Sequence, residues 1–193
     1  MSILAGIMIS IACAVYLSVG GVAGTVLFAT GLLGILFYQM KLFTGKAGLL
    51  VDGGITLADL GIIWFGNFIG TGIGSLMLLG MRGAELAPAA RTIIENRMMA
   101  GDLENAIAGV ICGILMYIAT ANWEKEKNVF LPIMCVATFI LIGGNHCVAD
   151  MGYFWLADNG LTGIGNVLSV SLGNLIGCNL IPGVKKCIIS QLR

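Results

Sequence analysis

Charged side chains are scarce in this sequence. Asp, Glu, Lys and Arg together make up 10% of the 193 residues, while hydrophobic residues make up 58%. A soluble domain carries roughly 25% charged residues. A chain with so few charges could not cover a water-exposed surface, so the composition predicts an integral membrane protein whose surroundings are the lipid bilayer. The net charge of zero also removes the case for a nucleic-acid partner.

Histidine is almost absent, and the cysteines are dispersed. The chain has one histidine, His146, and six cysteines that form no CxxC pair and no Cys/His cluster. Metal centres, disulfide frameworks and haem sites depend on such groupings. We therefore expect no metal and no cofactor. The pattern also argues against an electron-transfer subunit, and we expect a protein that is not an enzyme.

Long apolar runs are what the chain has in abundance. A transmembrane helix needs about 20 mostly apolar residues. Six candidates cover residues 3–19, 22–40, 57–79, 104–121, 129–155 and 164–181. The sequence therefore predicts an all-α membrane protein that forms a single domain over residues 1–193. The polar stretch 81–101 is expected to be an extramembrane connection, and Asp158-Asn159-Gly160 a turn.

The basic residues indicate how the six spans are oriented. If both termini are cytoplasmic, the inner loops carry six Lys and Arg residues and the outer loops carry three. An excess of positive charge is typical of cytoplasmic loops. We therefore expect a multi-pass protein of the cell (inner or plasma) membrane with both termini in the cytoplasm.

Two short segments repeat along the chain. Residues 66–70 read GNFIG and residues 173–177 read GNLIG, so Asn67 and Asn174 occupy the same place in each. Each segment lies in the third span of its half. Because three is an odd number, the two halves must cross the membrane in opposite senses. This predicts two inverted repeats, over approximately residues 1–80 and 104–184, which is a common plan among transporters.

Polar residues interrupt the second span of each half. Residues 42–45, LFTG, follow the second run, and residues 143–150, GGNHCVAD, divide the fifth. Paired interruptions in corresponding spans point to a transport site. The N–H groups at the start of a half-helix suit an anion, and Thr44 and His146 add a hydroxyl and an imidazole. A lone histidine in an apolar segment can also be purely structural.

Bulky apolar side chains flank these polar breaks. Phe28 and Leu32 lie one turn apart on the second span, so they share a face. Phe139 lies two turns before His146, and Leu42 and Phe43 are within the first break. Such groups could form constrictions that exclude hydrated ions. Ordinary helix packing explains the same spacing equally well.

Taken together, these segments resemble the formate/nitrite transporter family. Residues 42–45 resemble its LFTG loop, residues 143–151 its G-x-E-H-x-x-A-N-M segment, and both GN-x-IG elements its third- and sixth-span signatures; residues 97–113 resemble the approach to its fourth span. The resemblance covers nearly the whole chain. It implies an aquaporin-like protomer with broken second and fifth helices, one pore per protomer, and a homopentamer.

The resemblance also implies a function. It implies transport of small monovalent anions such as formate, nitrite or hydrosulfide, coupled to a proton. Thr44 and His146 would be the central polar pair, with Asn145 beside them. The constriction residues implied by the resemblance are Phe28, Leu32, Leu42, Phe43 and Phe139.

Several charged or amide positions depart from the family pattern. Asn145 stands where the family has Glu, and Asp150, Lys46 and Gly113 each stand where it has Asn. Lys41 stands where the family has a carboxylate, and Arg97 stands where it has Lys. An unpaired charge inside the membrane would be costly. We therefore expect Asp150 to pair with Lys41 or Lys46 across the two breaks.

These observations predict a route for the substrate. Positive potential, with Arg97 contributing, would draw an anion into a vestibule, and the anion would meet Thr44 and His146 at the centre. A proton from His146, or from water, would yield the neutral acid, which crosses an apolar ring at far lower cost than the charged form. The alternative is a neutral-solute or water channel of the same fold, in which His146→Ala would leave anion flux unchanged.

Overall fold

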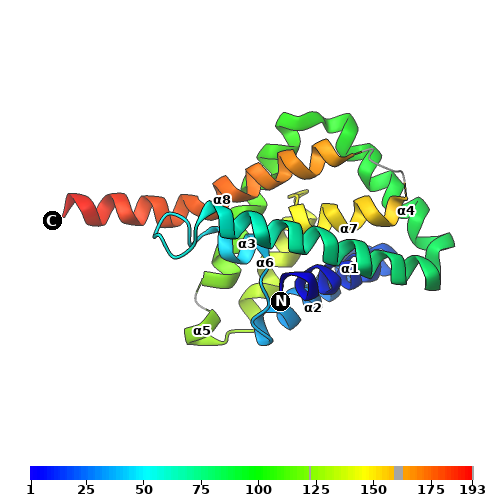
Figure 1. Ribbon diagram of the computed structural model, residues 1–193, viewed down its shortest axis with the longest axis horizontal. Coiled ribbons are helices and arrows are strands. Elements are labelled where there is room, and N and C mark those ends of the chain that lie inside the picture. Colours follow the sequence, from blue (N-terminus) through cyan, green and yellow to red (C-terminus); the bar gives the residue numbers. More distant parts are fainter. Residues whose placement is uncertain (122, 159–162, 193) are drawn as a thin grey trace.

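The computed structural model describes residues 1–121, 123–158 and 163–192, and the regular structure within them is helical (Figure 1). Part of the expected Asp158-Asn159-Gly160 turn lies outside the described residues. Asp158 itself ends a helix in the left-handed conformation, with φ 52°. The helices are α1 (Ser2–Val19), α2 (Gly21–Phe37), α3 (Phe43–Ala47), α4 (Leu57–Ala121), α5 (Trp123–Glu126), α6 (Phe130–Leu141), α7 (Cys147–Ala157) and α8 (Ile164–Gln191).

The chain reverses sharply between α1 and α2. Gly20 and Gly21 form this connection, and both have positive φ angles, 65° and 55°. Glycine adopts such angles without the steric cost that a Cβ atom brings. Two apolar helices can therefore follow one another with almost no loop, and α1 packs against both α2 and α4.

Helix α4 is the scaffold of the molecule. It contacts α8, α1 and α7 most extensively, and Figure 1 shows it bending around them. Its helical geometry is interrupted at Arg82 and at Gly101, where φ is 80°. These two points divide it into the expected apolar segments at either end and a middle segment, residues 83–100.

The middle segment of α4 coincides with the polar connection expected from the sequence. It is helical, and the reason is visible in its pattern: Leu86, Ala90 and Ile94 are spaced four residues apart and are buried. Residues with this spacing share one face of a helix. Arg97 lies three residues beyond Ile94, so it is close to the same face of the helix, and its side chain is 24% exposed.

Both polar breaks are interruptions between helices. Helix α2 ends at Phe37 and α3 begins at Phe43, while α6 ends at Leu141 and α7 begins at Cys147. The residues that precede α3 and α7 are Leu42 and His146, and both have extended backbone angles. The breaks thus have the same local form, with an extended residue leading directly into a helix.

The two GN-x-IG segments pack against glycines of other helical segments. Gly6 of α1 lies against the backbone of Asn67, and Gly113 of α4 lies against the backbone of Asn174. The offset between Gly6 and Gly113 equals the offset between Asn67 and Asn174. The close contact between α1 and the start of α4 is therefore repeated between the end of α4 and α8.

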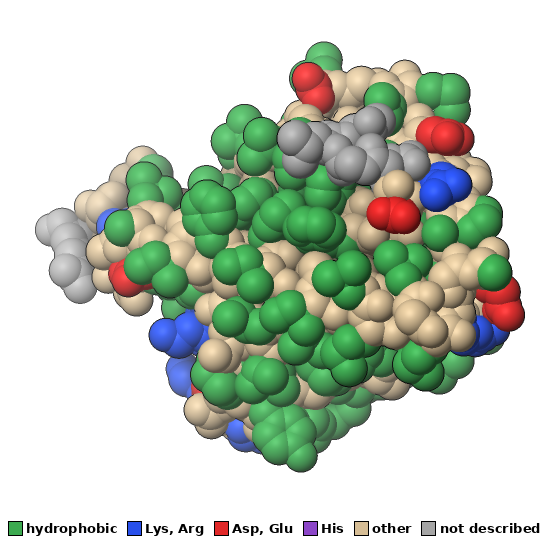
Figure 2. Space-filling model, turned by 45° about the vertical axis from the view of Figure 1, so that its right-hand side comes forward, with side chains coloured by type: hydrophobic (Ala, Val, Ile, Leu, Met, Phe, Trp, Pro, Cys, Tyr) green, Lys and Arg blue, Asp and Glu red, His purple; other side chains and the backbone are tan. Residues whose placement is uncertain are grey.

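The outer surface is strongly apolar. Figure 2 shows a face dominated by hydrophobic side chains, with the charged side chains near its edges. Three helices in the described residues are long and apolar enough to cross a membrane, namely α1, α8 and the helix that begins at Leu57, and α2 and α6 are shorter apolar helices. Exposed residues such as Leu76, Phe65 and Leu172 would be costly to hydrate but suit contact with lipid or another protein.

Candidate functional site

The centre of the site is a hydrogen bond between the two breaks. The hydroxyl oxygen of Thr44, from α3, lies 2.8 Å from Nε2 of His146, at the start of α7. The two side chains are 1% and 3% exposed. Two polar groups that are 102 residues apart in sequence are therefore brought together inside an otherwise apolar core.

The backbone around His146 determines which ring nitrogen carries the proton. Its Nδ1 accepts a hydrogen bond of 3.2 Å from the backbone N–H of Ala149. A nitrogen that accepts this bond cannot hold a proton itself, so the neutral ring carries its hydrogen on Nε2 and donates it to Thr44. The hydroxyl hydrogen of Thr44 then has no acceptor among the described residues. Thr44 itself lines neither of the two cavities described below, whereas His146 lines the first.

Two asparagines hold the breaks in the same way. Asn67 accepts a hydrogen bond from the N–H of Phe43 and donates to the carbonyls of Ser2 and Lys41. Asn174 accepts from the N–H of Cys147 and donates to the carbonyls of Gly109 and Asn145. Each asparagine thus ties a half-helix to its own half of the chain.

These bonds change one expectation from the sequence. The N–H groups at the starts of the half-helices were expected to face an anion. The first N–H of each is instead occupied by an asparagine, and the N–H of Ala149 is occupied by His146. A buried N–H must find a partner, and here the protein supplies it. The N–H groups of Phe43, Cys147 and Ala149 are therefore not available to a ligand.

Two cavities approach the Thr44–His146 pair. The first, about 220 Å³ in volume, is lined in part by Phe28, Phe139 and His146. The second, about 290 Å³, is lined in part by Leu32 and Leu42. Because Phe28 and Leu32 are one turn apart on α2, the cavities lie on successive turns of the same helix. We call them the Arg97 cavity and the Lys46 cavity, after the cations in their walls.

Four of the expected constriction residues lie between or beside these cavities. Phe28 and Phe139 line the Arg97 cavity, and the Phe139 ring stacks on His146 with 6.0 Å between the ring centroids. Leu32 and Leu42 line the Lys46 cavity. Phe43 is buried but lines neither cavity, and its backbone N–H is held by Asn67.

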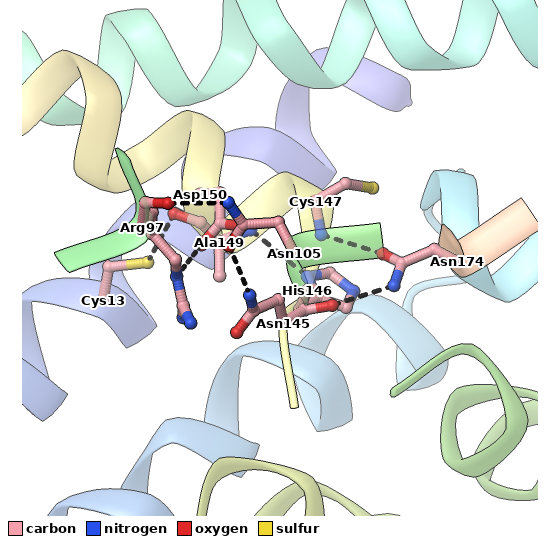
Figure 3. Close-up of polar contacts among 9 residues, drawn as sticks. All are labelled: Cys13, Arg97, Asn105, Asn145, His146, Cys147, Ala149, Asp150 and Asn174. Carbon is pink, nitrogen blue, oxygen red and sulfur yellow. Dashed lines mark hydrogen bonds and ion pairs between the residues drawn. The ribbon is translucent and has the colours of Figure 1, made fainter. Parts of the chain in front are cut away.

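Asp150 makes its ion pair with Arg97. The distance between Arg97 Nε and Asp150 Oδ1 is 3.6 Å, and the Asp150 side chain is 1% exposed (Figure 3). The expectation that Asp150 would pair with Lys41 or Lys46 is therefore wrong. Asp150 points from α7 toward the middle segment of α4, and both lysines line the Lys46 cavity. The helical form of that middle segment is what brings Arg97 within reach.

Asn145 lies beside the site and lines neither cavity. Its amide nitrogen donates to Oδ1 of Asn105, and Nδ2 of Asn105 donates to the carbonyl of Arg97 (Figure 3). Asn145 is 2% exposed. This chain of amides links the break before α7 to the segment that carries Arg97.

Sequence reasoning missed several residues of the site. Asn105 is one, because nothing in its neighbourhood marks it as a partner of Asn145. Tyr16 and Tyr153 line the Arg97 cavity from α1 and α7. Cys178 donates to the carbonyls of Thr44 and Gly113, so it supports the backbone under the central pair. The only signal for Cys178 was its place directly after the second GN-x-IG segment.

Comparison with known proteins identifies a family and a similar fold. The model of the formate/nitrite transporter family matches residues 1–187. Among solved structures, a pentameric formate channel with formate bound is similar in fold, with a TM-score of 0.80 and 22% sequence identity over 98% of this chain and 95% of that chain. An FNT family ion channel gives a TM-score of 0.82 at 22% identity, over 97% of this chain and 88% of that chain. A search of curated protein sequences finds no match.

Proposed function

The chain belongs to the formate/nitrite transporter family, and from this we propose that it conducts a small monovalent anion, or its weak acid, across the cell membrane through a pore of its own in each protomer. The family consists of transport proteins, so the chain is a channel or transporter and not an enzyme. The substrates of this proposal are formate, nitrite, hydrosulfide and acids of similar size. The solved formate channel of similar fold supports formate as the first to test.

The proposed architecture is six membrane spans in two inverted repeats. The first half would comprise α1, α2 with α3, and the first segment of α4; the second would comprise the last segment of α4, α6 with α7, and α8. Helices α2–α3 and α6–α7 would each be one broken span. The matching bonds of Asn67 and Asn174 support this proposal. Both termini would be cytoplasmic, and five protomers would assemble around a common axis.

The observation that carries the proposed function is the hydrogen bond between Thr44 and His146 at the point where two cavities approach each other. Apolar side chains surround that point on both sides. An anion in such a place would lose its hydration, and an uncompensated charge there is the main cost of passage. The Thr44 hydroxyl supplies a hydrogen bond, and protonation of the anion removes the charge.

The route of the proton follows from the hydrogen bonds of His146. Its Nδ1 is held by the Ala149 N–H, so the ring could accept a second proton only after this bond is released. We infer that water in a cavity delivers the proton to the anion, while His146 fixes the Thr44 hydroxyl through Nε2. The neutral acid then passes between the apolar side chains. Transport of this kind moves one proton with each anion.

Flux measurements test the proposal. Purified protein in liposomes would be given formate, nitrite, hydrosulfide, acetate and lactate in turn, with the external pH varied. We expect uptake of at least one acid to rise as external pH falls, because a larger inward proton gradient drives acid entry. Uptake that ignores the pH gradient and carries a current would instead identify an anion channel.

The variant His146→Ala separates this proposal from a neutral-solute or water channel. Loss of the Nε2–H donor removes the group that orients Thr44, and we expect acid flux to fall about tenfold or more, as for the loss of one positioned polar group in a transport path. Unchanged acid flux together with water or neutral-solute permeation would favour the alternative. The size of the purified complex, compared with wild type, shows that the variant is folded.

A further inference from the structure

The fourth residue of each half-helix is charged, and the two charges are opposite. Lys46 is the fourth residue of α3 and Asp150 is the fourth residue of α7. The backbone N–H of Lys46 bonds to the carbonyl of Leu42, and that of Asp150 bonds to the carbonyl of His146. Because Leu42 and His146 are the residues that lead into the two half-helices, Lys46 and Asp150 occupy equivalent places in the two breaks.

The two charges have different surroundings. Asp150 is fully buried and faces Arg97, and both residues line the Arg97 cavity. One positive and one negative group therefore cancel there. Tyr16, Tyr153 and the neutral ring of His146 complete its titratable side chains. The Arg97 cavity is consequently polar but carries no net charge.

The Lys46 cavity keeps its positive charge. Lys41 and Lys46 both line it, and neither makes an ion pair among the described residues. The one acidic residue in its wall, Glu124, lies 3.5 Å from Lys127 and is paired with it. Asp59 shares a neighbouring cavity with both lysines, where it is exposed to solvent. The net charge around the Lys46 cavity remains positive.

We propose that the Lys46 cavity is an anion-loading site and that the negative charge of Asp150 prevents the Arg97 cavity from being one. The pore therefore binds an anion more tightly at the Lys46 end than at the Arg97 end. This inference rests on the proposed function. It concerns a departure of this chain: the same pair of half-helices with an uncharged residue at 150 would leave Arg97 free to attract an anion.

The direction of the asymmetry follows from elementary electrostatics. Two unit charges about 8 Å apart at an effective dielectric constant of about 40 interact by an amount that changes an equilibrium constant roughly fivefold. An anion in the Lys46 cavity gains this attraction from Lys46. In the Arg97 cavity, Asp150 repels it about as strongly as Arg97 attracts it. At equal anion concentrations on the two sides the net flux is still zero. The asymmetry therefore appears only as a difference between the anion concentrations that give half-maximal flux from the two ends.

The test measures formate flux from each end of the pore separately. Protein would be reconstituted in one known orientation, and the formate concentration that gives half-maximal flux would be determined from both sides at one pH. For the wild type we expect the half-saturating concentration to be about fivefold lower at the Lys46 end. Equal values at the two ends would overturn the inference.

Two variants and one control make the test specific. Asp150→Asn retains the side-chain shape and should lower half-saturation about fivefold at the Arg97 end only, and Lys46→Gln should raise it about fivefold at the Lys46 end only. Lys125→Gln removes an exposed lysine from nearby α5 that lines neither cavity and should change neither value. Variants that shift both ends together contradict the proposal.

The outcomes also separate this inference from the proposed function. If wild-type protein conducts none of the small acids, the proposed function fails. If it conducts formate with identical half-saturation from both ends, only the asymmetry fails. Should Asp150→Asn not fold, the Lys46→Gln variant decides alone, because Lys46 is only partly buried and its loss leaves no buried charge unpaired.

Discussion

Single hydrogen bonds at the site show how few residues define its chemistry. His146 uses both ring nitrogens, one toward the backbone of Ala149 and one toward Thr44. Its protonation state, its orientation and the free hydroxyl hydrogen of Thr44 all follow from this arrangement. The sequence predicted that His146 and Thr44 belong together, because each interrupts an apolar run. It could not predict the tautomer, which depends on where the N–H of Ala149 points.

The pairing of Asp150 illustrates what a sequence leaves open at this scale. A buried carboxylate needs a cation nearby, and the sequence correctly predicted that Asp150 pairs with one. Lys41 and Lys46 were the cations of the opposite break, whereas Arg97 lay in a stretch expected to be an outer connection. Only the packing of that stretch against α7 places its guanidinium 3.6 Å from the carboxylate. Chemistry thus predicted the need for a partner, and the fold selected which one.

The asparagine of the second GN-x-IG segment should be critical for stability. Asn174→Asp keeps the oxygen that accepts from Cys147 but loses both donated bonds, to Gly109 and Asn145. The Asn145 carbonyl is left without this donor, the Gly109 carbonyl keeps only its place in the helix of α4, and a buried carboxylate replaces the amide. A buried acceptor without a partner costs about 1–3 kcal/mol, and burial of a carboxylate adds to that cost. We therefore expect a loss of about 2–5 kcal/mol, measured by thermal unfolding in detergent.

A matched control for this variant lies two residues beyond the segment's end. Asn179 also donates two bonds through its amide, to Ala47 and Leu175, but it is only half-buried. Water can replace the bonds that Asn179→Asp loses, so we expect a much smaller decrease in the melting temperature. Equal decreases for the two variants would contradict the special role assigned to Asn174.

Individual helices explain why the two GN-x-IG segments make matching contacts. Gly6 and Gly113 let α1 and the end of α4 approach the segments around Asn67 and Asn174. The sequence predicted the repeat from the five-residue segments and the breaks from their polar residues. The sequence marked Gly113 only as a departure from the family pattern and did not mark Gly6 at all, since glycines are abundant in the chain, with 29 in total. Their importance comes from which backbone they face, and that is a property of the packed helices.

The glycine contacts lead to a prediction about α4. In Gly113→Ala the new Cβ would press against the backbone of Asn174 and Cys178, which cannot move aside as a flexible side chain can. Overpacking of this kind costs about 1–3 kcal/mol. We expect a lower melting temperature and a smaller yield of folded protein, measured by size-exclusion chromatography after heating.

The same helix contains a control glycine, at which we expect substitution by alanine not to lower the melting temperature. A Cβ at Gly61 meets no atom within 4 Å. Because alanine is favoured over glycine inside a helix by roughly 1 kcal/mol, Gly61→Ala should leave the melting temperature unchanged or raise it. If both variants behaved alike, close packing at Gly113 would not be what distinguishes them.

At the scale of the whole molecule, the central pair and the two cavities can be described within a single chain. The central pair and the walls of both cavities come from residues of the same protomer. The apolar outer surface, by contrast, has room for lipid and for neighbouring protomers. In the proposed function, assembly positions the protomers and each one conducts through its own pore. Composition alone predicted the membrane setting, whereas the positions of the two cavities required the fold.

This picture predicts how mixed oligomers behave. With a protomer mass of 20.1 kDa, we expect a pentamer of about 100 kDa by native mass spectrometry, as closed symmetric assembly predicts. Wild-type and His146→Ala chains, carrying different tags, would be co-expressed in several ratios, and the composition of each purified pentamer preparation would be measured. If every protomer has its own pore, formate flux should fall in direct proportion to the wild-type fraction. A pore shared by all five protomers would instead lose flux steeply once a single variant chain enters, and a curve of that shape would contradict one pore per protomer.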